Sequence, residues 1–306
     1  MSQDPIAPVP PDLRRLRTEF LVVTGMSGAG RTTVANVMED DGWYVVDNLP
    51  PRLILDLVDL AEEVAATRPP DATTRVAAVV DVRARQFSDS LSEAMTAMRR
   101  RGWEPNILFL DATDEALVRR FESVRRPHPL QGDGRLLDGI QAERALLRDL
   151  RSAASVVIDT SGLNVHQLAR KVRPLVSVGD EKPLRLAILS FGFKYGVPLD
   201  ADFVFDMRFL PNPFWVPELR LLTGTDAAVA DFVHAQPGAT GFVDGVVAVL
   251  DTVRAGYLRE GRRYATVAVG CTGGKHRSVA IAERLSAALA SDDVATFTLH
   301  RDLGRE

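Results

Sequence analysis

Short apolar runs rich in valine, isoleucine and leucine alternate with longer amphipathic stretches over about the first 176 residues of the chain. The apolar runs are continuous, which is typical of strands buried on both faces of a parallel sheet. The amphipathic stretches between them predict helices on both faces of that sheet. We expect strands at residues 20–24, 43–46, 75–80, 106–110 and 155–158, and helices at residues 32–40, 51–66, 87–101, 113–124 and 138–150.

The rest of the chain repeats this alternation after residues 177–183, whose serine, glycine, proline and charged residues are typical of a linker. We therefore expect a flexible leader at residues 1–18, one α/β domain at residues 19–177 and a second α/β domain at residues 178–306. In the second domain we expect strands at residues 184–191, 203–206, 265–269 and 294–299, and helices at residues 226–234, 245–260 and 276–290.

Composition limits the class of protein. Of the 306 residues, 46% are hydrophobic and 25% are charged, values that exclude a mostly disordered chain. No apolar run approaches the roughly 18 residues of a membrane span, and the leader lacks the apolar core of a signal peptide. A single cysteine cannot form an internal disulfide, which fits a reducing compartment. The net charge of -4 gives no overall attraction to nucleic acid. We expect a cytoplasmic protein with no membrane partner.

A strand, a glycine-rich loop and a helix follow one another near the amino end, and this order is typical of a phosphate-binding P-loop. The motif G-x-x-x-x-G-K-[ST] is matched, with arginine in place of lysine, by Gly25, Met26, Ser27, Gly28, Ala29, Gly30, Arg31 and Thr32. Backbone N–H groups of the loop would hold the phosphates of ATP or GTP, Thr32 would bind Mg²⁺, and Arg31 would reach the outer phosphates. The alternative is a glycine-rich turn without a ligand, which the flanking strand and helix make the weaker interpretation. Arginine grips phosphate but weakens the case for rapid phosphoryl transfer.

Aspartates end four of the expected strands, at the sheet edge where ligands bind in open α/β folds. They are Asp47, Asp81, Asp111 and Asp159. We take Asp81 as the first candidate for a carboxylate that orders Mg²⁺ and Asp47 as the second. Either residue could instead cap the following helix.

An arginine-rich segment covers residues 119–126 and ends before a proline. It resembles the arginine-bearing lid of nucleotide and small-molecule kinases, whose cations stabilise the transferring phosphoryl group. A solvated basic face of a helix is an equally good interpretation.

A second strand–loop–helix pattern lies near the carboxyl end and comprises Cys271, Thr272, Gly273, Gly274, Lys275, His276, Arg277 and Ser278. The spacing C-x5-R-[ST] is that of cysteine-dependent phosphatases, in which a thiolate attacks phosphate. An anion-binding loop without chemistry and an inert turn around a buried cysteine are the alternatives. The sequence identifies no acid for the leaving group, which favours the anion-binding loop. Lys194, in the dense segment 190–196, is a second candidate cation for the same ligand.

These motifs, together with residues 46–50, 81–83, 190–196 and 206–213, occur in one order that resembles the RapZ/YvcJ family of bacterial P-loop proteins. The resemblance covers about residues 19–301 and implies a P-loop domain that binds ATP and GTP with slow hydrolysis. It places ATP on the first loop and GTP on Asp81, Val82, Arg83 and Ala84. It further implies a carboxyl-terminal domain that senses a phosphorylated amino sugar and, in some members, an RNA-binding role.

The chain departs from the family pattern at Arg31 and in its tail, residues 298–306, which lacks the basic cluster of RNA-binding relatives. We interpret the protein as a nucleotide-binding regulator with weak NTPase activity and a separate phospho-metabolite domain. The alternatives are a P-loop small-molecule kinase and an RNA-binding adapter without significant catalysis. Only the arginine-rich segment at residues 119–126 favours RNA as a partner, and a second copy of the chain is a further candidate partner.

Overall fold

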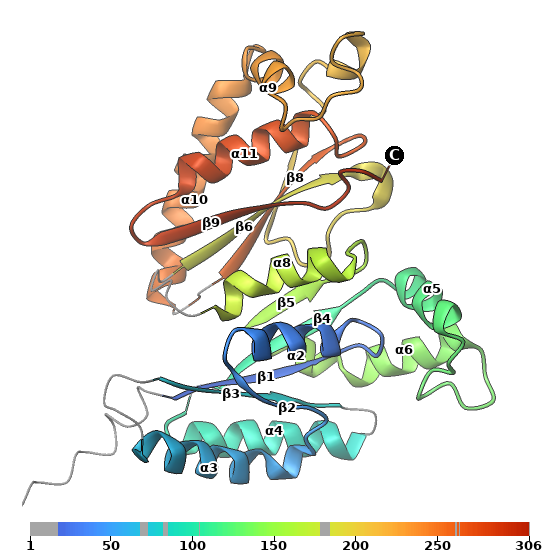
Figure 1. Ribbon diagram of the computed structural model, residues 1–306, viewed down its shortest axis with the longest axis vertical. Coiled ribbons are helices and arrows are strands. Elements are labelled where there is room, and N and C mark those ends of the chain that lie inside the picture. The colour runs from blue at the N-terminus through green and yellow to red at the C-terminus, as the bar shows by residue number, and fades with distance from the viewer. Residues whose placement is uncertain are drawn as a thin grey trace, which may run out of the picture. The chain divides into compact units, whose positions relative to one another are not determined.

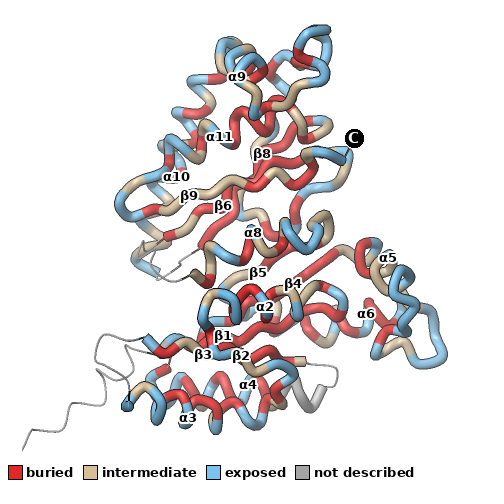
Figure 2. The backbone as a smooth tube through the Cα atoms, viewed as in Figure 1, coloured by how far each residue is buried: buried red, intermediate tan, exposed pale blue. Residues whose placement is uncertain are grey.

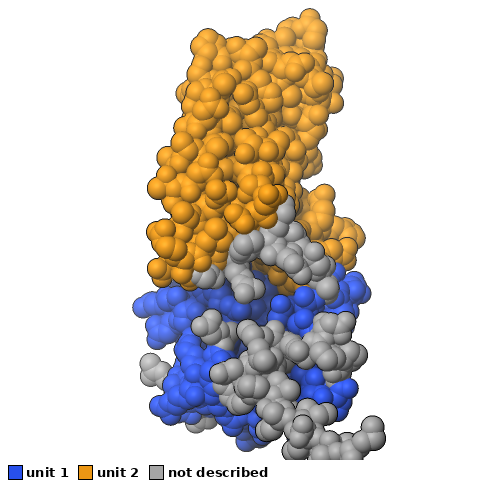
Figure 3. Space-filling view, turned by 90° about the vertical axis from the view of Figure 1, so that its left-hand side faces the viewer, with its two compact units in different colours: residues 1–157 blue, residues 158–306 orange. Residues whose placement is uncertain are grey.

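The computed structural model describes residues 18–67, 73–81, 85–103, 105–177, 184–260, 262 and 264–305. The expected leader, apart from Thr18, lies outside these residues, and so do positions 178–183 of the expected linker. Two compact units divide the chain, Met1–Val157 and Ile158–Glu306, and Figure 3 colours them separately.

The first unit is built on a parallel sheet with strand order β2-β3-β1-β4-β5. Its strands are β1 (Thr18–Gly25), β2 (Tyr44–Val46), β3 (Thr74–Val79), β4 (Asn106–Asp111) and β5 (Val156–Asp159). β1 pairs in parallel with both β3 and β4, so it lies where the chain switches from one side of the sheet to the other. In open α/β sheets, ligands bind beyond the carboxyl ends of the strands at such a switch point.

Helices cover both faces of this sheet, with α2 (Arg31–Asp40) on one face and α3 (Ile54–Thr67) and α4 (Arg85–Arg100) on the other (Figure 1). A 3-10 turn, η1 (Pro51–Leu53), leads into α3. Three further helices follow β4: α5 (Asp114–Val124), α6 (Leu136–Leu146) and α7 (Arg148–Ser152). The expected helix at residues 138–150 is therefore two helices that break at Leu147.

The second unit contains a four-stranded parallel sheet with order β7-β8-β6-β9. Its strands are β6 (Leu184–Gly192), β7 (Phe203–Asp206), β8 (Tyr264–Cys271) and β9 (Val294–His300). Its helices are α8 (Val165–Val176), α9 (Ala227–His234), α10 (Ala239–Arg259) and α11 (Arg277–Leu289), with 3-10 turns η2 (Phe193–Tyr195) and η3 (Pro213–Trp215). The expected fold class, two α/β domains with a P-loop sheet first, is confirmed.

Strands β3, β4, β6 and β8 are buried along nearly their whole length, as their continuous apolar sequences predict, whereas β2, β7 and most of β9 are only partly buried (Figure 2). In the second unit one face of β6 and β8 packs on α10 and α11, with Ile188, Val267 and Ile281 fully buried. The carboxyl ends of the strands carry polar and glycine-rich loops in both units, and the candidate sites lie there.

Helix α8 belongs by its contacts to the second unit, where it packs against β6 and β9. Lys171 of α8 forms a fully buried ion pair with Asp200, which also accepts the N–H of Asp159 at 2.9 Å. We expected the domain boundary after residue 177 because linker composition begins there. The contacts divide the chain earlier, and the boundary at residue 178 stays a prediction.

Candidate functional sites

The first glycine loop leaves β1 at Gly25, where close backbone packing excludes a side chain. Its φ is 143°, and a Cβ atom there would lie 2.1 Å from the carbonyl oxygen of Leu110. Met26 then donates its N–H to this same carbonyl at 2.9 Å. The start of the loop is therefore fixed against the end of β4.

The open end of α2 supplies the N–H groups that face the loop. Gly30 is the N-cap residue of α2 and has a left-handed conformation, with φ 102°. Because glycine has no side chain, it cannot accept a capping hydrogen bond from the first turn of the helix. The first intrahelical bond is donated by Val34, so the N–H groups of Arg31, Thr32 and Thr33 have no partner within the helix. Together with the positive end of the helix dipole they form a site that favours an anion.

Two N–H groups of the expected phosphate cradle are engaged inside the protein. Ser27 donates its N–H to Glu143 Oε2 at 2.9 Å and its hydroxyl to Glu143 Oε1 at 2.6 Å. Ala29 donates its N–H to the Met26 carbonyl at 3.0 Å. The donors that remain for a ligand are concentrated at the helix end of the loop.

A buried acid from α6 thus supports the loop from behind. Glu143 is 1% exposed and also lies 3.0 Å from Nε2 of His128, which is 2% exposed. The N–H of Leu130 donates to Nδ1 of His128 at 3.1 Å, so Nε2 carries the proton and donates to Glu143. This network connects the loop to the segment that follows α5.

Arg31, expected at the outer phosphates, lies at the end of β3. Its Nη2 is 3.2 Å from Asp81 Oδ2, and its Nη1 donates to the Val80 carbonyl at 3.3 Å. The two charged side chains are each 14% exposed. The P-loop cation and the first candidate for a Mg²⁺ carboxylate are therefore partners of each other.

The arginine-rich segment belongs to α5 and its exit. Arg120 donates to the Gly28 carbonyl at 2.9 Å, and the ring of Phe121 lies 3.1 Å from the position of a Cβ atom on Gly28. The other three arginines are exposed: Arg119, Arg125 and Arg126. One arginine of the expected lid thus holds the loop backbone, whereas three face solvent.

The four strand-end aspartates have different surroundings. Asp47 is exposed and accepts the N–H of Asn48 at 2.8 Å. Asp111 is buried between Arg144 and Arg151, at 2.8 and 2.7 Å, which indicates a structural role. Burial alone would lower the pKa of Arg144. Its hydrogen bonds to Asp111 and Asp114 outweigh this effect, so the pKa of Arg144 is raised.

Asp159 also has its oxygens engaged, with Oδ1 accepting the N–H of Ser161 at 2.9 Å and Oδ2 that of Leu199 at 3.0 Å. Asp81 remains the aspartate beside the P-loop cation. The remainder of the expected GTP segment, Val82, Arg83 and Ala84, lies outside the described residues.

The second glycine loop follows Cys271, the last residue of β8. Cys271 is 3% exposed, its sulfur accepts the N–H of Gly274 at 3.3 Å, and it lies 3.1 Å from the hydroxyl of Ser278. Gly274 has φ 78°, and a Cβ atom there would lie 2.7 Å from the backbone nitrogen of Gly192. The loop is therefore packed tightly on the end of β6, with the sulfur beneath it.

Arg277 begins α11 and is only 5% exposed. Its Nη1 donates to the Leu210 carbonyl at 2.8 Å and its Nη2 to Thr272 Oγ1 at 3.4 Å. Within the described part of the chain, Arg277 forms no ion pair and its Nε has no hydrogen-bond partner. A buried guanidinium without a carboxylate is costly unless an anion binds to it.

Further basic side chains surround this loop. Lys275 Nζ and His276 Nε2 each lie 3.3 Å from the Arg220 carbonyl. Lys194 donates its backbone N–H to the Thr272 carbonyl at 3.3 Å, and its exposed ammonium lies 4.7 Å from the ring centre of Tyr195. The structure therefore brings the expected residues of the second loop and Lys194 to one sheet edge.

Arg208 lies at the same edge, 4.1 Å above the ring of Phe193. Hydrogen bonds from Arg208 are the main cause that lowers the pKa of Asp206, and the charge of Arg277 adds to it. Asp206 therefore stays ionised and offsets part of the positive charge around the loop.

The tail folds back onto this edge through a buried carboxylate. Asp302 is fully buried and accepts the N–H of Gly192 at 2.8 Å, Arg301 at 2.7 Å and Arg305 at 2.7 Å. Arg301 and Arg305 of the tail are thus engaged within the unit.

Comparison with known protein families agrees with the order of these motifs. Residues 18–179 match the RapZ-like N-terminal domain, and residues 184–304 match the RapZ C-terminal domain. The chain belongs to the RapZ family. A nucleotide-binding protein of Streptomyces coelicolor is 57% identical over 288 residues, which are 94% of this chain and 95% of that relative. One from a Parafrankia strain is 55% identical over 288 residues, 94% of this chain and 98% of that relative.

Solved structures similar to this RapZ-family chain match about half of it. An unliganded sugar kinase from Janibacter is 21% identical with a TM-score of 0.34, and the match covers 53% of this chain and 99% of that one. A shikimate kinase from Bacteroides thetaiotaomicron is 16% identical with a TM-score of 0.35, covering 52% and 98%. A likeness at this level does not identify an activity.

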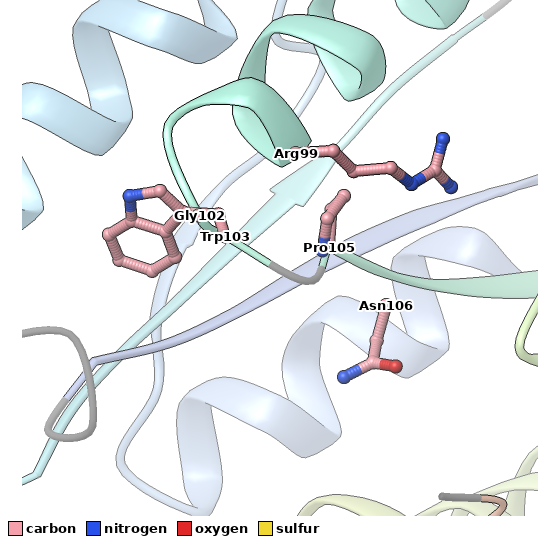
Figure 4. A pocket seen from close by; sticks show the side chains of 5 residues that line it. All are labelled: Arg99, Gly102, Trp103, Pro105 and Asn106. Atoms are coloured by element: carbon pink, nitrogen blue, oxygen red, sulfur yellow. The ribbon is translucent and has the colours of Figure 1, made fainter. Parts of the chain in front are cut away.

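A pocket of about 470 Å³ lies elsewhere in this RapZ-family protein, at the amino end of β4 (Figure 4). It is lined by Arg99, Gly102, Trp103, Pro105 and Asn106. Both glycine loops lie beyond the carboxyl ends of their strands, so this pocket belongs to neither.

Within the described residues, no helix is both long and apolar enough for a membrane span. Among the same residues, no group of three or more acidic, histidine or cysteine side chains is arranged to hold a metal ion.

Three residues with central roles in the two sites of this RapZ-family chain were not predicted from the sequence: Glu143, His128 and Asp302. Glu143 is 116 positions from Ser27, and it lies in an amphipathic helix where an acid suggests a surface position. For Asp302, the neighbouring Arg301 and Arg305 could have indicated a carboxylate that holds two arginines.

Proposed function

We propose that this RapZ-family protein is a nucleotide-binding regulator that binds ATP or GTP with Mg²⁺ at the first loop and hydrolyses them slowly. The observation that carries the proposal is the open amino end of α2 behind Gly30, at the switch point of the sheet. N–H groups of Arg31, Thr32 and Thr33 are the expected phosphate donors. The names of the relatives, which are described as nucleotide-binding proteins, support the same assignment.

The residues at this edge suit Mg²⁺. Thr32 is exposed in the first turn of α2, and Asp81 places a carboxylate two residues beyond the end of β3. Hydroxyl and carboxylate oxygens are ligands that this ion prefers, and the ion would neutralise phosphate charge. GTP would reach this same edge, with Asp81 as its contact among the described residues.

Two contacts favour a regulator over a small-molecule kinase. Arg31 lies on Asp81 and Val80, so the cation expected to follow a transferring phosphoryl group is held at the sheet. Arg120 is held by the Gly28 carbonyl. Exposed arginines at the end of α5 are the feature that would favour RNA.

For the second unit we propose a phosphorylated amino sugar as the ligand of the loop at residues 271–278. Arg277 carries this assignment, because its buried guanidinium forms no ion pair within the described residues, and the one carboxylate on which its charge acts, Asp206, is already paired with Arg208. Lys275 and the N–H groups at the start of α11 would share the phosphate. The buried sulfur of Cys271, enclosed by Gly274 and Ser278, supports binding without chemistry.

Thermal unfolding of the full-length chain tests both assignments, because a ligand that binds the folded state raises its melting temperature. ATP or GTP with Mg²⁺, and separately glucosamine phosphate, should each raise it. Arg277→Ala should weaken sugar-phosphate binding by about 2–4 kcal/mol and leave the nucleotide response intact. Should Arg277→Ala not fold, Lys275→Ala takes its place, with a smaller loss.

Cys271→Ser separates binding from phosphatase chemistry in the same experiment. It removes the nucleophile but keeps a small polar atom, so sugar-phosphate binding should remain within about threefold of wild type. Phosphate release by the wild type that is lost in Cys271→Ser would replace the sensor with a phosphatase. No response to any sugar phosphate would refute the ligand assignment of the second unit.

A further inference from the structure

The tail packs on the segment that carries Lys194. The buried carboxylate of Asp302 accepts the N–H of Gly192 at 2.8 Å, and the guanidinium of Arg301 donates to the Gly196 carbonyl at 2.6 Å. These two contacts fix the residues on either side of the 3-10 turn η2, in which Lys194 is the middle residue. The tail therefore sets the position of this turn.

Tyr195 is the point at which the tail and Lys194 meet. Its hydroxyl donates to the carbonyl of Arg305 at 2.9 Å. The ammonium of Lys194 lies 4.7 Å from the centre of its ring, and the guanidinium of Arg305 lies 4.9 Å from the same centre. A cation at such a distance is attracted by the quadrupole of the aromatic ring. The ring that restrains the exposed ammonium is therefore held in turn by the tail.

The same turn lies against the second glycine loop. Lys194 donates its N–H to the Thr272 carbonyl at 3.3 Å. A Cβ atom on Gly274 would lie 2.7 Å from the nitrogen of Gly192 and 3.1 Å from Cβ of Asp302. Loop, turn and tail thus contact one another. Within the described part of the chain the Lys194 ammonium forms no ion pair, which leaves its charge for an anion at the loop.

Restraint of the ammonium matters because a lysine side chain is long and flexible. Such a side chain loses rotamer freedom when its ammonium is fixed on a phosphate, and this loss opposes binding. An ammonium that already lies on the ring of Tyr195 has less freedom left to lose. The tail can therefore favour binding without touching the ligand, because it holds the ring.

We propose that the tail, residues 301–305, controls the affinity of the second loop for its sugar phosphate, with Tyr195 as the residue that positions the Lys194 ammonium. Lys194 contacts the phosphate, whereas Tyr195 and the tail act through it. A change that draws Arg305 away from Tyr195 weakens sugar-phosphate binding. This inference rests on the proposed ligand of the second unit and adds to it the segment that regulates the site.

Calorimetric titration of the full-length chain with glucosamine phosphate tests the arrangement as a double-mutant cycle. Lys194→Ala should weaken binding about tenfold, and Tyr195→Leu, which removes both ring and hydroxyl, about fivefold. Tyr195→Leu added to Lys194→Ala should cost less than about 1.5-fold more, because no ammonium remains for the ring to position. A ring with a purely structural role would weaken binding equally in both backgrounds, by about fiftyfold in all.

Deletion of residues 305–306 tests the tail, because it removes the carbonyl that accepts the Tyr195 hydroxyl. It should weaken binding about threefold, and this loss should also vanish in the Lys194→Ala background. Val197→Ala is the matched control, since Val197 is exposed next to the same turn and makes none of the contacts described above. It should bind glucosamine phosphate like the wild type.

Circular dichroism checks that each variant is folded. Should Tyr195→Leu not fold, Tyr195→Phe takes its place, because it keeps the ring and loses only the bond to the Arg305 carbonyl. It should weaken binding about twofold, again only while Lys194 is present.

Four results would overturn the inference. They are wild-type affinity in folded Tyr195→Leu or in the 305–306 deletion, losses that multiply in the double variant, unchanged affinity in Lys194→Ala, and an equal loss in Val197→Ala. If the wild type binds no sugar phosphate, the proposed ligand of the second unit is itself refuted, which is a different outcome.

Discussion

Glu143 is the residue whose replacement should most disturb the first glycine loop. It accepts hydrogen bonds from the N–H and hydroxyl of Ser27 and from Nε2 of His128, all of them buried. Glu143→Ala leaves the Ser27 N–H and the His128 Nε2–H without an acceptor, while the hydroxyl can rotate to another. Each unsatisfied buried donor costs about 1–3 kcal/mol, so we expect a loss of about 2–6 kcal/mol in the free energy of unfolding.

Glu143→Gln separates geometry from charge. The amide oxygen can accept from the Ser27 N–H and from His128, and the amide nitrogen can donate to the Ser27 hydroxyl oxygen. All three contacts persist, so we expect a change within about 1 kcal/mol. Nucleotide affinity should follow the same order, with glutamine close to wild type and alanine much weaker, because the loop keeps its shape only in the former.

Urea unfolding followed by tryptophan fluorescence measures this effect in the first unit. Trp43 and Trp103 are 9% and 5% exposed there, whereas Trp215 of the second unit is mostly exposed and should change little on unfolding. Gln141→Ala, at an exposed position of the same helix, is the control for helix propensity. A loss below about 1 kcal/mol in Glu143→Ala, or an equal loss in Glu143→Gln, would refute this account of the loop.

Two further predictions concern the second unit. Asp302→Ala leaves a buried arginine without its carboxylate and should lower the free energy of unfolding by about 3–5 kcal/mol in thermal or urea unfolding. Arg305→Ala removes a partly exposed partner of the same carboxylate and should cost no more than about 1 kcal/mol, so equal losses would contradict the buried role of Asp302. Burial lowers the pKa of His300 although the charge of Glu283 opposes this shift. As pH falls, His300 is therefore protonated at a higher pH in the unfolded chain than in the folded one, which destabilises the folded state. The stability difference between wild type and His300→Gln should therefore shrink from pH 8 to pH 5.5 as the ordinary histidine pKa of about 6.5 is crossed, and a difference that widens would show the sign to be wrong.

The sheets could be predicted from the sequence because short continuous apolar runs, in a chain of this composition, are typical of buried strands. The strand at residues 203–206 matches β7 (Phe203–Asp206), and the other strands agree to within two residues. Helix starts were less predictable. α10 begins at Ala239, six residues before the expected helix at residue 245, because Gly241 and Gly245 weaken the helical pattern there.

Helix α8 was not predicted as a separate element, although its start carries a recognisable signal. Asn164 and Gln167 form a reciprocal capping box, with both N–H to side-chain distances at 2.9 Å. Pro174 inside the last turn obscured the pattern.

The positions of the two glycine loops followed from motif spacing, but the partners of their side chains did not. Arg31 and Asp81 were each assigned to a ligand, and the sequence gives no sign that they contact each other. Such pairings depend on the register between β1 and β3, where Val23 lies opposite Val79. Register is set by tertiary packing and is not recorded in either motif.

The position of α8 also determines where recombination between relatives can exchange one domain without breaking a buried ion pair. The first family domain, residues 18–179, contains α8, yet Lys171 from this helix neutralises Asp200 inside the second unit. A recombination event within residues 178–183 would join α8 from one parent to a sheet from another, and a parent lacking either charge would leave the other buried alone. A segment that can be exchanged between relatives with this ion pair intact therefore begins before α8. That point precedes residues 177–183, where the linker composition of the sequence suggests a domain boundary.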